Sequence, residues 1–126
     1  MHWTSRVVYF KVIPAGASVS YGSTWTSEKM TRIVTVPVGY GDGYMRSMSG
    51  QAEVLINQKR YPVVGSICMD QLMVDIGWDQ CFNGDEVTLL GSQGHQAIHA
   101  EELAQWTGTI SYEVLTAINS RVPRVY

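Results

Sequence analysis

The chain has 126 residues, of which 45% are hydrophobic and 16% are charged, and its formal net charge is -2. This size and apolar content suit one compact domain over residues 1–126 with a core of its own. The scattered charges form no basic stripe for nucleic acid, and no apolar run approaches the roughly 20 residues that span a bilayer. Because the sequence also begins without the apolar stretch of a signal peptide, we expect a cytoplasmic protein without nucleic-acid or membrane partners.

Short runs rich in Val, Ile, Thr and Tyr, separated by Gly, Pro, Asn and Asp, indicate a β-domain. Pro37 cannot donate a ladder hydrogen bond and is predicted to lie at a sheet edge or a strand end. Residues 57–60 are polar and of hairpin length, so the runs that flank them are predicted to pair. Frequent turns between short strands favour a small barrel or sandwich. The predicted strands cover residues 6–13, 32–38, 52–56, 61–64, 72–76 and 86–90.

Two short helices are predicted near the C-terminal end. Residues 100–107 carry two glutamates in their first turn, where the helix dipole favours acidic side chains, and Gly108 can supply a left-handed C-terminal residue. The second helix is predicted over about residues 112–119, with Ser111 as its N-cap.

Common catalytic signatures are absent from the sequence, which contains no P-loop, no HExxH and no GxSxG motif. The histidines at positions 2, 95 and 99 stand in polar stretches and are expected to be exposed. Cys68 and Cys81 have neither a CxxC nor a metal-ligand spacing, so we expect two free thiols, with Cys68 buried. Conventional hydrolase and metal chemistry therefore have little support, and no metal site is expected.

Glycine stands beside tyrosine in two predicted loops, residues 20–24 (SYGST) and 39–44 (GYGDGY). Glycine there permits positive φ angles and close approach of the backbone to another surface. Two interpretations stay open on these residues alone: the tyrosines cap the edge of a β-core, or they hold a phenol where it exchanges a proton. Since the ordinary tyrosine pKa is about 10, proton exchange near neutral pH needs a cationic or hydrogen-bonding neighbour.

Two further motifs leave a similar choice open. Residues 67–71 (ICMDQ) fit a buried strand that ends with an aspartate at a turn, with methionine as core filler, or part of a site. Residues 111–113 (SYE) fit a capped helix start, or a tyrosine hydroxyl beside free backbone N–H groups, a place that suits an anion such as phosphate.

Five motifs together resemble the C-terminal domain of alanine racemases. In chain order they are VSYGSTW, VPVGYGDGY, VGSICMDQ, GTISYEV and SRVPRVY, and the match runs from about residue 6 to residue 126. The resemblance implies a mainly β fold, a small Greek-key-like β-barrel with two short C-terminal helices. It also implies a homodimeric, cytoplasmic enzyme that interconverts L-alanine and D-alanine for peptidoglycan synthesis. Pyridoxal 5'-phosphate is then bound to a lysine of a separate N-terminal (β/α)₈ barrel.

The same resemblance assigns roles to individual residues. Tyr21 corresponds to the catalytic tyrosine, which exchanges the α-proton on the L face of the substrate in the partner subunit's active site. Met69 matches the residue whose backbone N–H holds the substrate carboxylate, and Tyr40 the tyrosine that narrows the active-site entrance. Tyr112 matches one that binds the cofactor phosphate, whereas Asp70 receives only a supporting role.

Two departures from the family pattern limit what is expected of this chain alone. The barrel is absent, and Lys11, Lys29 and Lys59 lie outside any motif like that of the cofactor-binding lysine. We therefore expect the isolated chain to bind no cofactor and to be inactive. Ser66 replaces the arginine of the common VGRICMD motif, which leaves a serine-preferring racemase open. A non-catalytic binding or assembly module is the remaining alternative.

Overall fold

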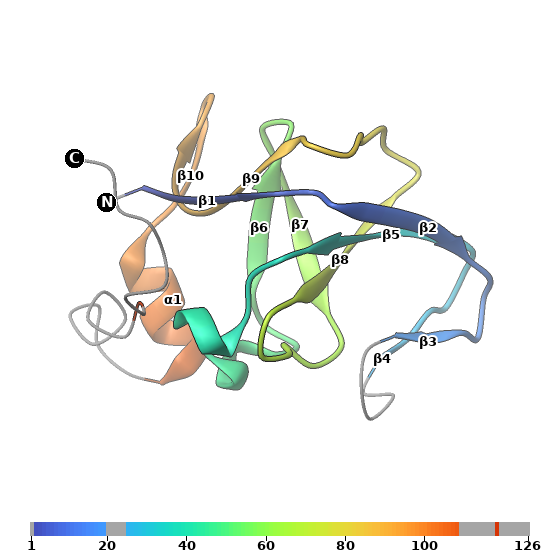
Figure 1. The fold of residues 1–126 in the computed structure, drawn as a ribbon, viewed down its shortest axis with the longest axis horizontal. Coiled ribbons are helices and arrows are strands. Elements are labelled where there is room, and N and C mark those ends of the chain that lie inside the picture. Colours follow the sequence, from blue (N-terminus) through green and yellow to red (C-terminus); the bar gives the residue numbers. More distant parts are fainter. Residues whose placement is uncertain (1, 20–24, 109–117, 119–126) are drawn as a thin grey trace.

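The computed structural model describes residues 2–19, 25–108 and 118, and within them the chain is mostly β (Figure 1). An eight-stranded antiparallel sheet curls into a half-barrel, a two-stranded sheet lies beside it, and one α-helix follows. The strands are β1 (Trp3–Arg6), β2 (Tyr9–Ile13), β3 (Ser18–Val19), β4 (Trp25–Thr26), β5 (Thr31–Val36), β6 (Glu53–Ile56), β7 (Lys59–Val64), β8 (Leu72–Gly77), β9 (Glu86–Gln93) and β10 (Gln96–Ile98). Two 3-10 helices, η1 (Tyr40–Asp42) and η2 (Arg46–Met48), precede β6, and the α-helix is α1 (Ala100–Thr107).

The curl of the sheet comes from its first segment. The strand order is β1-β9-β6-β7-β8-β5-β2, so β1 and β2 lie at opposite ends of the path although only Val7 and Val8 separate them. The N–H of Val7 still donates to the carbonyl of Asp85 at 3.0 Å, whereas that of Val8 donates to Thr35 at 3.1 Å. The prediction of one strand over residues 6–13 is therefore wrong, because the chain changes its pairing partner in the middle of that run.

The predicted hairpin is confirmed, with a tighter turn than expected. Strands β6 and β7 pair from Ile56 opposite Lys59, which leaves only Asn57 and Gln58 in the turn. Both have positive φ, 50° and 64°, as the mirror-image turns favoured in hairpins require. Strand β7 accordingly begins two residues before the predicted start at residue 61.

The other predicted strands are confirmed with shifted ends. Strand β5 ends at Val36, so Pro37 lies just past the strand, as expected. The side chains of β8 alternate between buried and half-buried. Strand β9 extends to Gln93 and pairs with β10, a strand that was not predicted because residues 91–97 are mostly polar or glycine.

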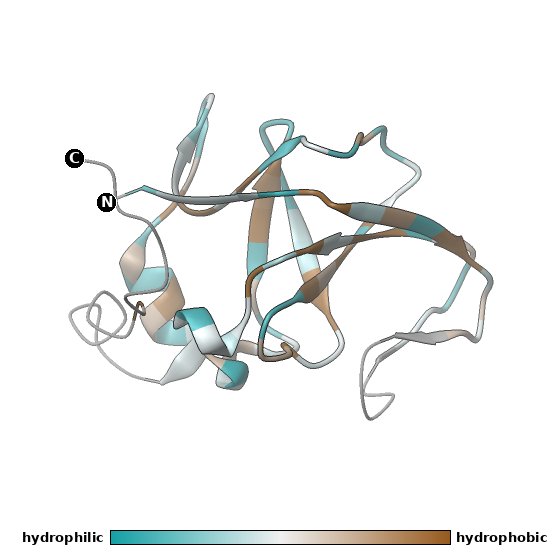
Figure 2. Ribbon diagram, viewed as in Figure 1, coloured by the Kyte–Doolittle hydropathy of each residue, from teal (hydrophilic) through white to brown (hydrophobic). Residues whose placement is uncertain are grey.

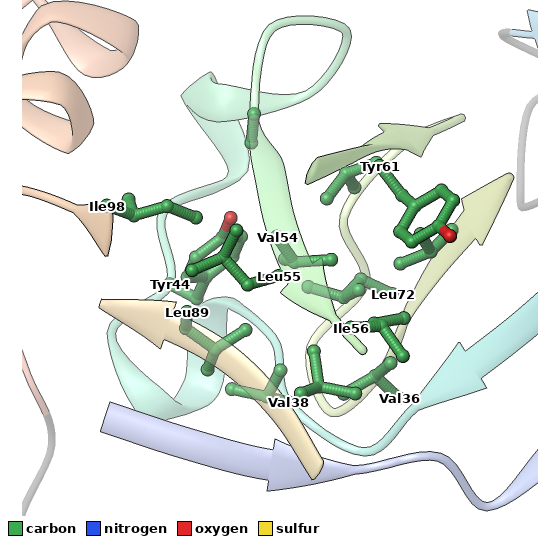
Figure 3. Close-up of a cluster of buried hydrophobic side chains, with 14 of the residues drawn as sticks. Val36, Val38, Tyr44, Val54, Leu55, Ile56, Tyr61, Leu72, Leu89 and Ile98 are labelled. Atoms are coloured by element: carbon green, nitrogen blue, oxygen red, sulfur yellow. The ribbon is translucent and has the colours of Figure 1, made fainter. Parts of the chain in front are cut away.

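The main core lies inside the curl of the sheet. Figure 2 shows the hydrophobic residues along β6 and β5, and Figure 3 shows Tyr44 within the cluster that includes Leu55, Leu89 and Ile98. A second, smaller cluster contains Ile13, Ile33 and Val64. With two clusters on a single curled sheet, the mainly β, barrel-like class predicted from the sequence is confirmed.

Helix α1 has the predicted bounds. A Glu102 carboxylate oxygen accepts a hydrogen bond from the His99 N–H at 2.9 Å, and Gly108 ends the helix in the left-handed region at φ 77°. The predicted second helix over residues 112–119 lies outside the described residues except for Ile118, which is buried.

An ion-pair network anchors α1 to the hairpin. The Arg60 guanidinium contacts Glu102 at 2.8 Å and Glu53 at 3.2 Å, and it donates to the Ala97 carbonyl at 2.6 Å. The hydrogen bond from Arg60 lowers the pKa of Glu102, since it stabilises the carboxylate form.

Candidate functional site

Two loops that are far apart in the sequence meet at one edge of the sheet. The tyrosine loop (residues 39–44) comes after β5, and the methionine loop (residues 67–71) comes before β8. The two strands are antiparallel neighbours, with Val36 opposite Leu72, so the end of one lies beside the start of the other. This register brings two of the predicted site segments together.

The two loops contact each other through their backbones. The N–H of Tyr40 donates to the Cys68 carbonyl at 3.0 Å, and that of Gly41 donates to the Met69 carbonyl at 2.8 Å. A Cβ atom at Gly39 would lie 2.0 Å from the Cys68 oxygen and 2.7 Å from the Met69 carbonyl carbon. Glycine is required at position 39 because no side chain fits between the loops.

Asp42 closes the tyrosine loop on itself. One of its carboxylate oxygens accepts a hydrogen bond from the Gly39 N–H at 3.1 Å, and Asp42 is only 9% exposed. Gly43 follows in the left-handed region at φ 101°, with its N–H donating to the Tyr40 carbonyl at 3.1 Å. Asp42 was not predicted as a site residue, although an acid three residues after Gly39 has the spacing that reaches back to a free N–H.

The predicted binding residues of these loops face outward. Tyr40 is 45% exposed and Met69 is 52% exposed, and Asp70 beside them is exposed as well. Within the described part of the chain, no backbone hydrogen bond is made by the Met69 N–H. The loops therefore leave the Met69 N–H and the Tyr40 side chain available for contact with a ligand or another surface.

The other tyrosine of the tyrosine loop belongs to the core. Tyr44 is 0% exposed and packs edge to face on Trp3, with ring centroids 5.8 Å apart. Of the two interpretations left open for the glycine–tyrosine loops, the structural one holds for this residue.

The two cysteines are free thiols, as predicted. Cys81 is the buried one, whereas Cys68 is only partly buried, so the expectation that Cys68 is buried is wrong. Its position in the methionine loop, whose backbone packs on the tyrosine loop, leaves the side chain near the surface.

Ser66 lines a hollow of about 430 Å³ on the surface just before the methionine loop. Ser49, Gly50 and the Asp75 carboxylate line the same hollow. The side chain of Asp75 is already engaged, because it accepts hydrogen bonds from the Thr31 hydroxyl at 2.5 Å and the Gly77 N–H at 2.9 Å.

The structure does not bring together all of the predicted site residues. Tyr21 and Tyr112 lie outside the described residues. Tyr21 falls in the chain between β3 and β4, which pair with Ser18 opposite Thr26. The geometry therefore covers Met69, Tyr40 and their supports, and the roles of the other two tyrosines stay predictions.

The described residues do not fit a covalently held pyridoxal cofactor. That group needs a lysine, but Lys11 lies on the edge strand β2, Lys29 lies between β4 and β5, and Lys59 pairs with Asp79 at 3.8 Å. Neither loop of the candidate site contains a lysine. Across the described ranges, no cluster of metal-ligating side chains is present and no helix is long and apolar enough to cross a bilayer.

Comparison with known proteins identifies relatives along the whole chain. A family model described as alanine racemase, C-terminal domain, matches residues 1–126. The alanine racemase of Carboxydothermus hydrogenoformans is 52% identical over 123 residues, which cover 97% of this chain and 33% of that protein. The alanine racemase of Methylacidiphilum infernorum is 50% identical over 125 residues, covering 98% of this chain and 32% of that protein.

Solved structures show the same relation. The alanine racemase from D-cycloserine producing Streptomyces lavendulae matches with a TM-score of 0.95 at 42% identity, over 99% of this chain and 33% of that one. The enzyme from Bacillus anthracis, solved with bound L-Ala-P, matches with a TM-score of 0.94 at 40% identity, over 98% of this chain and 32% of that one. The chain thus spans about a third of the length of the relatives that it matches.

Proposed function

The chain belongs to the family of alanine racemase C-terminal domains, and we propose that within its full-length protein it supplies one face of the active site for racemising alanine. The observation that carries the proposal is the pair of loops joined through their backbones, which leaves the Met69 N–H free beside the exposed Tyr40. A free N–H can donate a hydrogen bond to a carboxylate. Exposed aromatic side chains are enriched where one protein surface packs on another.

Racemisation needs a proton to leave one face of the α-carbon and another to arrive on the opposite face. Tyr21 is proposed to act on the L face, where its phenolate takes the α-proton of L-alanine and, in the reverse direction, its phenol returns one. Pyridoxal 5'-phosphate, held by the rest of the full-length protein, supplies the acidity of that proton when bound.

Three further roles complete the proposal. The Met69 N–H holds the substrate carboxylate, Tyr40 narrows the entrance, and Tyr112 binds the cofactor phosphate. Tyr21, Tyr40 and Met69 serve the active site of the partner subunit in a homodimer, whereas Tyr112 serves its own. D-alanine for peptidoglycan is the proposed product.

Ser66 keeps a serine-preferring racemase as the second candidate. The hollow of about 430 Å³ lined by Ser66 lies near the methionine loop, and it offers space for a substrate whose side chain is larger than that of alanine. Comparing kcat/KM of the full-length protein for L-serine and L-alanine decides between the two: a ratio above unity favours serine.

The test of the main proposal uses the full-length protein and Tyr21→Phe. We expect kcat/KM to fall by about 10²–10⁴-fold, the usual cost of losing a general acid–base group. The fall should be the same for both directions of racemisation, because L-alanine and D-alanine have equal free energy. In D₂O, exchange of the α-hydrogen should be lost from L-alanine but persist for D-alanine, whose proton leaves from the other face.

Each outcome has a distinct meaning. Equal loss of exchange from both enantiomers, or unchanged rates, contradicts the role given to Tyr21. Cofactor absorbance that matches wild type is the control for an intact site. The isolated chain with added cofactor is expected to be inactive, and D-alanine formation by it would contradict the need for a second domain. If the full-length protein does not racemise alanine, the alternative of a non-catalytic module is supported.

A further inference from the structure

The orientation of the free Met69 N–H is set by the tyrosine loop. The peptide between Cys68 and Met69 is trans, as are all peptide bonds of the described residues, so its C=O and N–H point in opposite directions. The hydrogen bond from the Tyr40 N–H fixes the Cys68 carbonyl at 3.0 Å. The Met69 N–H must therefore point away from the tyrosine loop, toward the side that the loop leaves open.

The next peptide is fixed in the same way. The Gly41 N–H holds the Met69 carbonyl at 2.8 Å, so both peptide planes that flank the Met69 Cα are clamped by consecutive N–H groups of the tyrosine loop. The orientation of these two peptide planes depends on the shape of the tyrosine loop, because a rotation of its 3-10 turn moves the Tyr40 and Gly41 N–H groups together.

Asp42 holds that shape. Its buried carboxylate accepts the Gly39 N–H at 3.1 Å across the turn, and Gly39 is the residue whose backbone packs directly on the Cys68 carbonyl. Without the carboxylate, the buried Gly39 N–H loses its partner. The turn is then held by backbone hydrogen bonds, from the Asp42 and Tyr44 N–H groups to the Gly39 carbonyl, at 3.0 Å and 3.2 Å. The loop can then relax by rotating the donors that clamp the methionine loop.

We propose that Asp42 is a positioning residue for carboxylate binding: it acts through Gly39 and the tyrosine loop to aim the Met69 N–H at the substrate carboxylate. This inference rests on the proposed function of Met69 and adds a residue that contacts no substrate. A purely structural role would lower stability and leave the affinity for carboxylates unchanged. A positioning role lowers that affinity in particular.

The experiment measures competitive inhibition of the full-length protein by propionate, which is alanine without its amino group. We expect Asp42→Ala to raise the propionate Ki and the alanine KM by about tenfold, a partial loss of a hydrogen bond to a charged group. The kcat should change little, since the carboxylate is held equally in the ground state and the transition state. Asp42→Asn keeps an acceptor oxygen and should restore the Ki to within about threefold of wild type.

Asp85→Ala is the matched control. The Asp85 carboxylate accepts the Phe82 N–H at 2.9 Å, also three residues back, but in an exposed turn away from both loops. Its propionate Ki is expected to equal that of wild type. If propionate inhibits the wild-type enzyme and Asp42→Ala is active with an unchanged Ki, the proposal for Asp42 is overturned and the proposed function is not. Absence of racemisation by the wild type instead contradicts the proposed function.

A second measurement tests the wild type directly and then the conservative variant. In full-length wild-type protein labelled with ¹⁵N-methionine, the Met69 amide resonance should shift on addition of propionate, and the Asp42→Asn variant should show the same shift at similar concentrations. No shift in the wild type at saturating propionate would overturn the proposal, because the N–H that Asp42 is said to aim would then not meet the carboxylate.

Discussion

Replacing Tyr44 by phenylalanine is expected to stabilise the chain or leave its stability unchanged, although Tyr44 is fully buried. Its ring packs in the core against Trp3, but among the described residues its hydroxyl has no hydrogen-bond partner. A buried hydroxyl without a partner costs about 1–3 kcal/mol of folding free energy, because it loses its bonds to water. The void left by one oxygen costs about 0.5 kcal/mol, so we expect a net gain near 1 kcal/mol at neutral pH.

The pH dependence of stability gives a second signature. Burial raises the pKa of Tyr44 above its ordinary value, so above pH 10 the unfolded chain releases this proton while the folded chain retains it. The free energy of unfolding is therefore unaffected by this titration below about pH 10 and decreases as the pH rises further. At pH 11 the loss is about 1.4 kcal/mol, and Tyr44→Phe removes it, so the advantage of the variant should grow between pH 9 and pH 11.

Urea unfolding followed by tryptophan fluorescence measures both effects. The control is Tyr61→Phe, because the Tyr61 hydroxyl donates to the Asp79 carboxylate at 2.6 Å. Losing that bond should cost about 1 kcal/mol, since Asp79 is partly exposed. If Tyr44→Phe destabilises the chain as much as Tyr61→Phe does, the Tyr44 hydroxyl has a partner and the reasoning fails.

Three further results follow from the contacts described above. Gly39→Ala places a Cβ 2.0 Å from the Cys68 oxygen and should cost about 2–3 kcal/mol in urea unfolding, from a steric clash and loss of the loop contacts; unchanged stability would contradict the close packing. Arg60 lowers the pKa of Glu102, so the stabilisation from this ion pair is present above the ordinary pKa of glutamate and is lost as the pH falls through the lowered pKa. Glu102→Gln should therefore destabilise the chain by about 0.5–1 kcal/mol at pH 7, and the difference should shrink as the pH falls below the ordinary pKa of glutamate. Burial raises the pKa of Cys81 to about 11, so iodoacetamide at pH 8 should modify Cys68 first, and equal rates would contradict the burial of Cys81.

Local patterns predicted the elements whose ends are marked by local chemistry. Helix α1 begins and ends where its acidic first turn and Gly108 indicate. The pairing of β6 with β7 follows from two apolar runs around a polar turn. The division of the first strand at Val7 and Val8 could not be predicted, because it depends on β9 and β5, which lie far along the chain.

The candidate site was predicted in its residue types but not in its supports. The methionine and tyrosine loops were singled out from glycine and tyrosine spacing and from the family resemblance, and the register of β5 on β8 explains why they meet. Nothing in the sequence separates the exposed Tyr40 from the buried Tyr44, since both follow glycine in the same loop. Asp42 was missed because its partner is a backbone N–H, and the spacing of an acid three residues after glycine was not considered.

The way the two loops are built supports the proposal that a second protein surface completes the site. Their backbone groups satisfy one another, so the loops keep their shape without a ligand. Tyr40 and Met69 are about half exposed, whereas a site complete within one domain would bury the groups that line it. An edge with an outward-facing aromatic side chain, a free N–H and no lysine in either loop is suited to presenting these groups to a substrate held elsewhere. On this reasoning the chain and the cofactor-binding domain should each be inactive alone, and mixing the two should restore racemisation if their contact surfaces suffice for assembly.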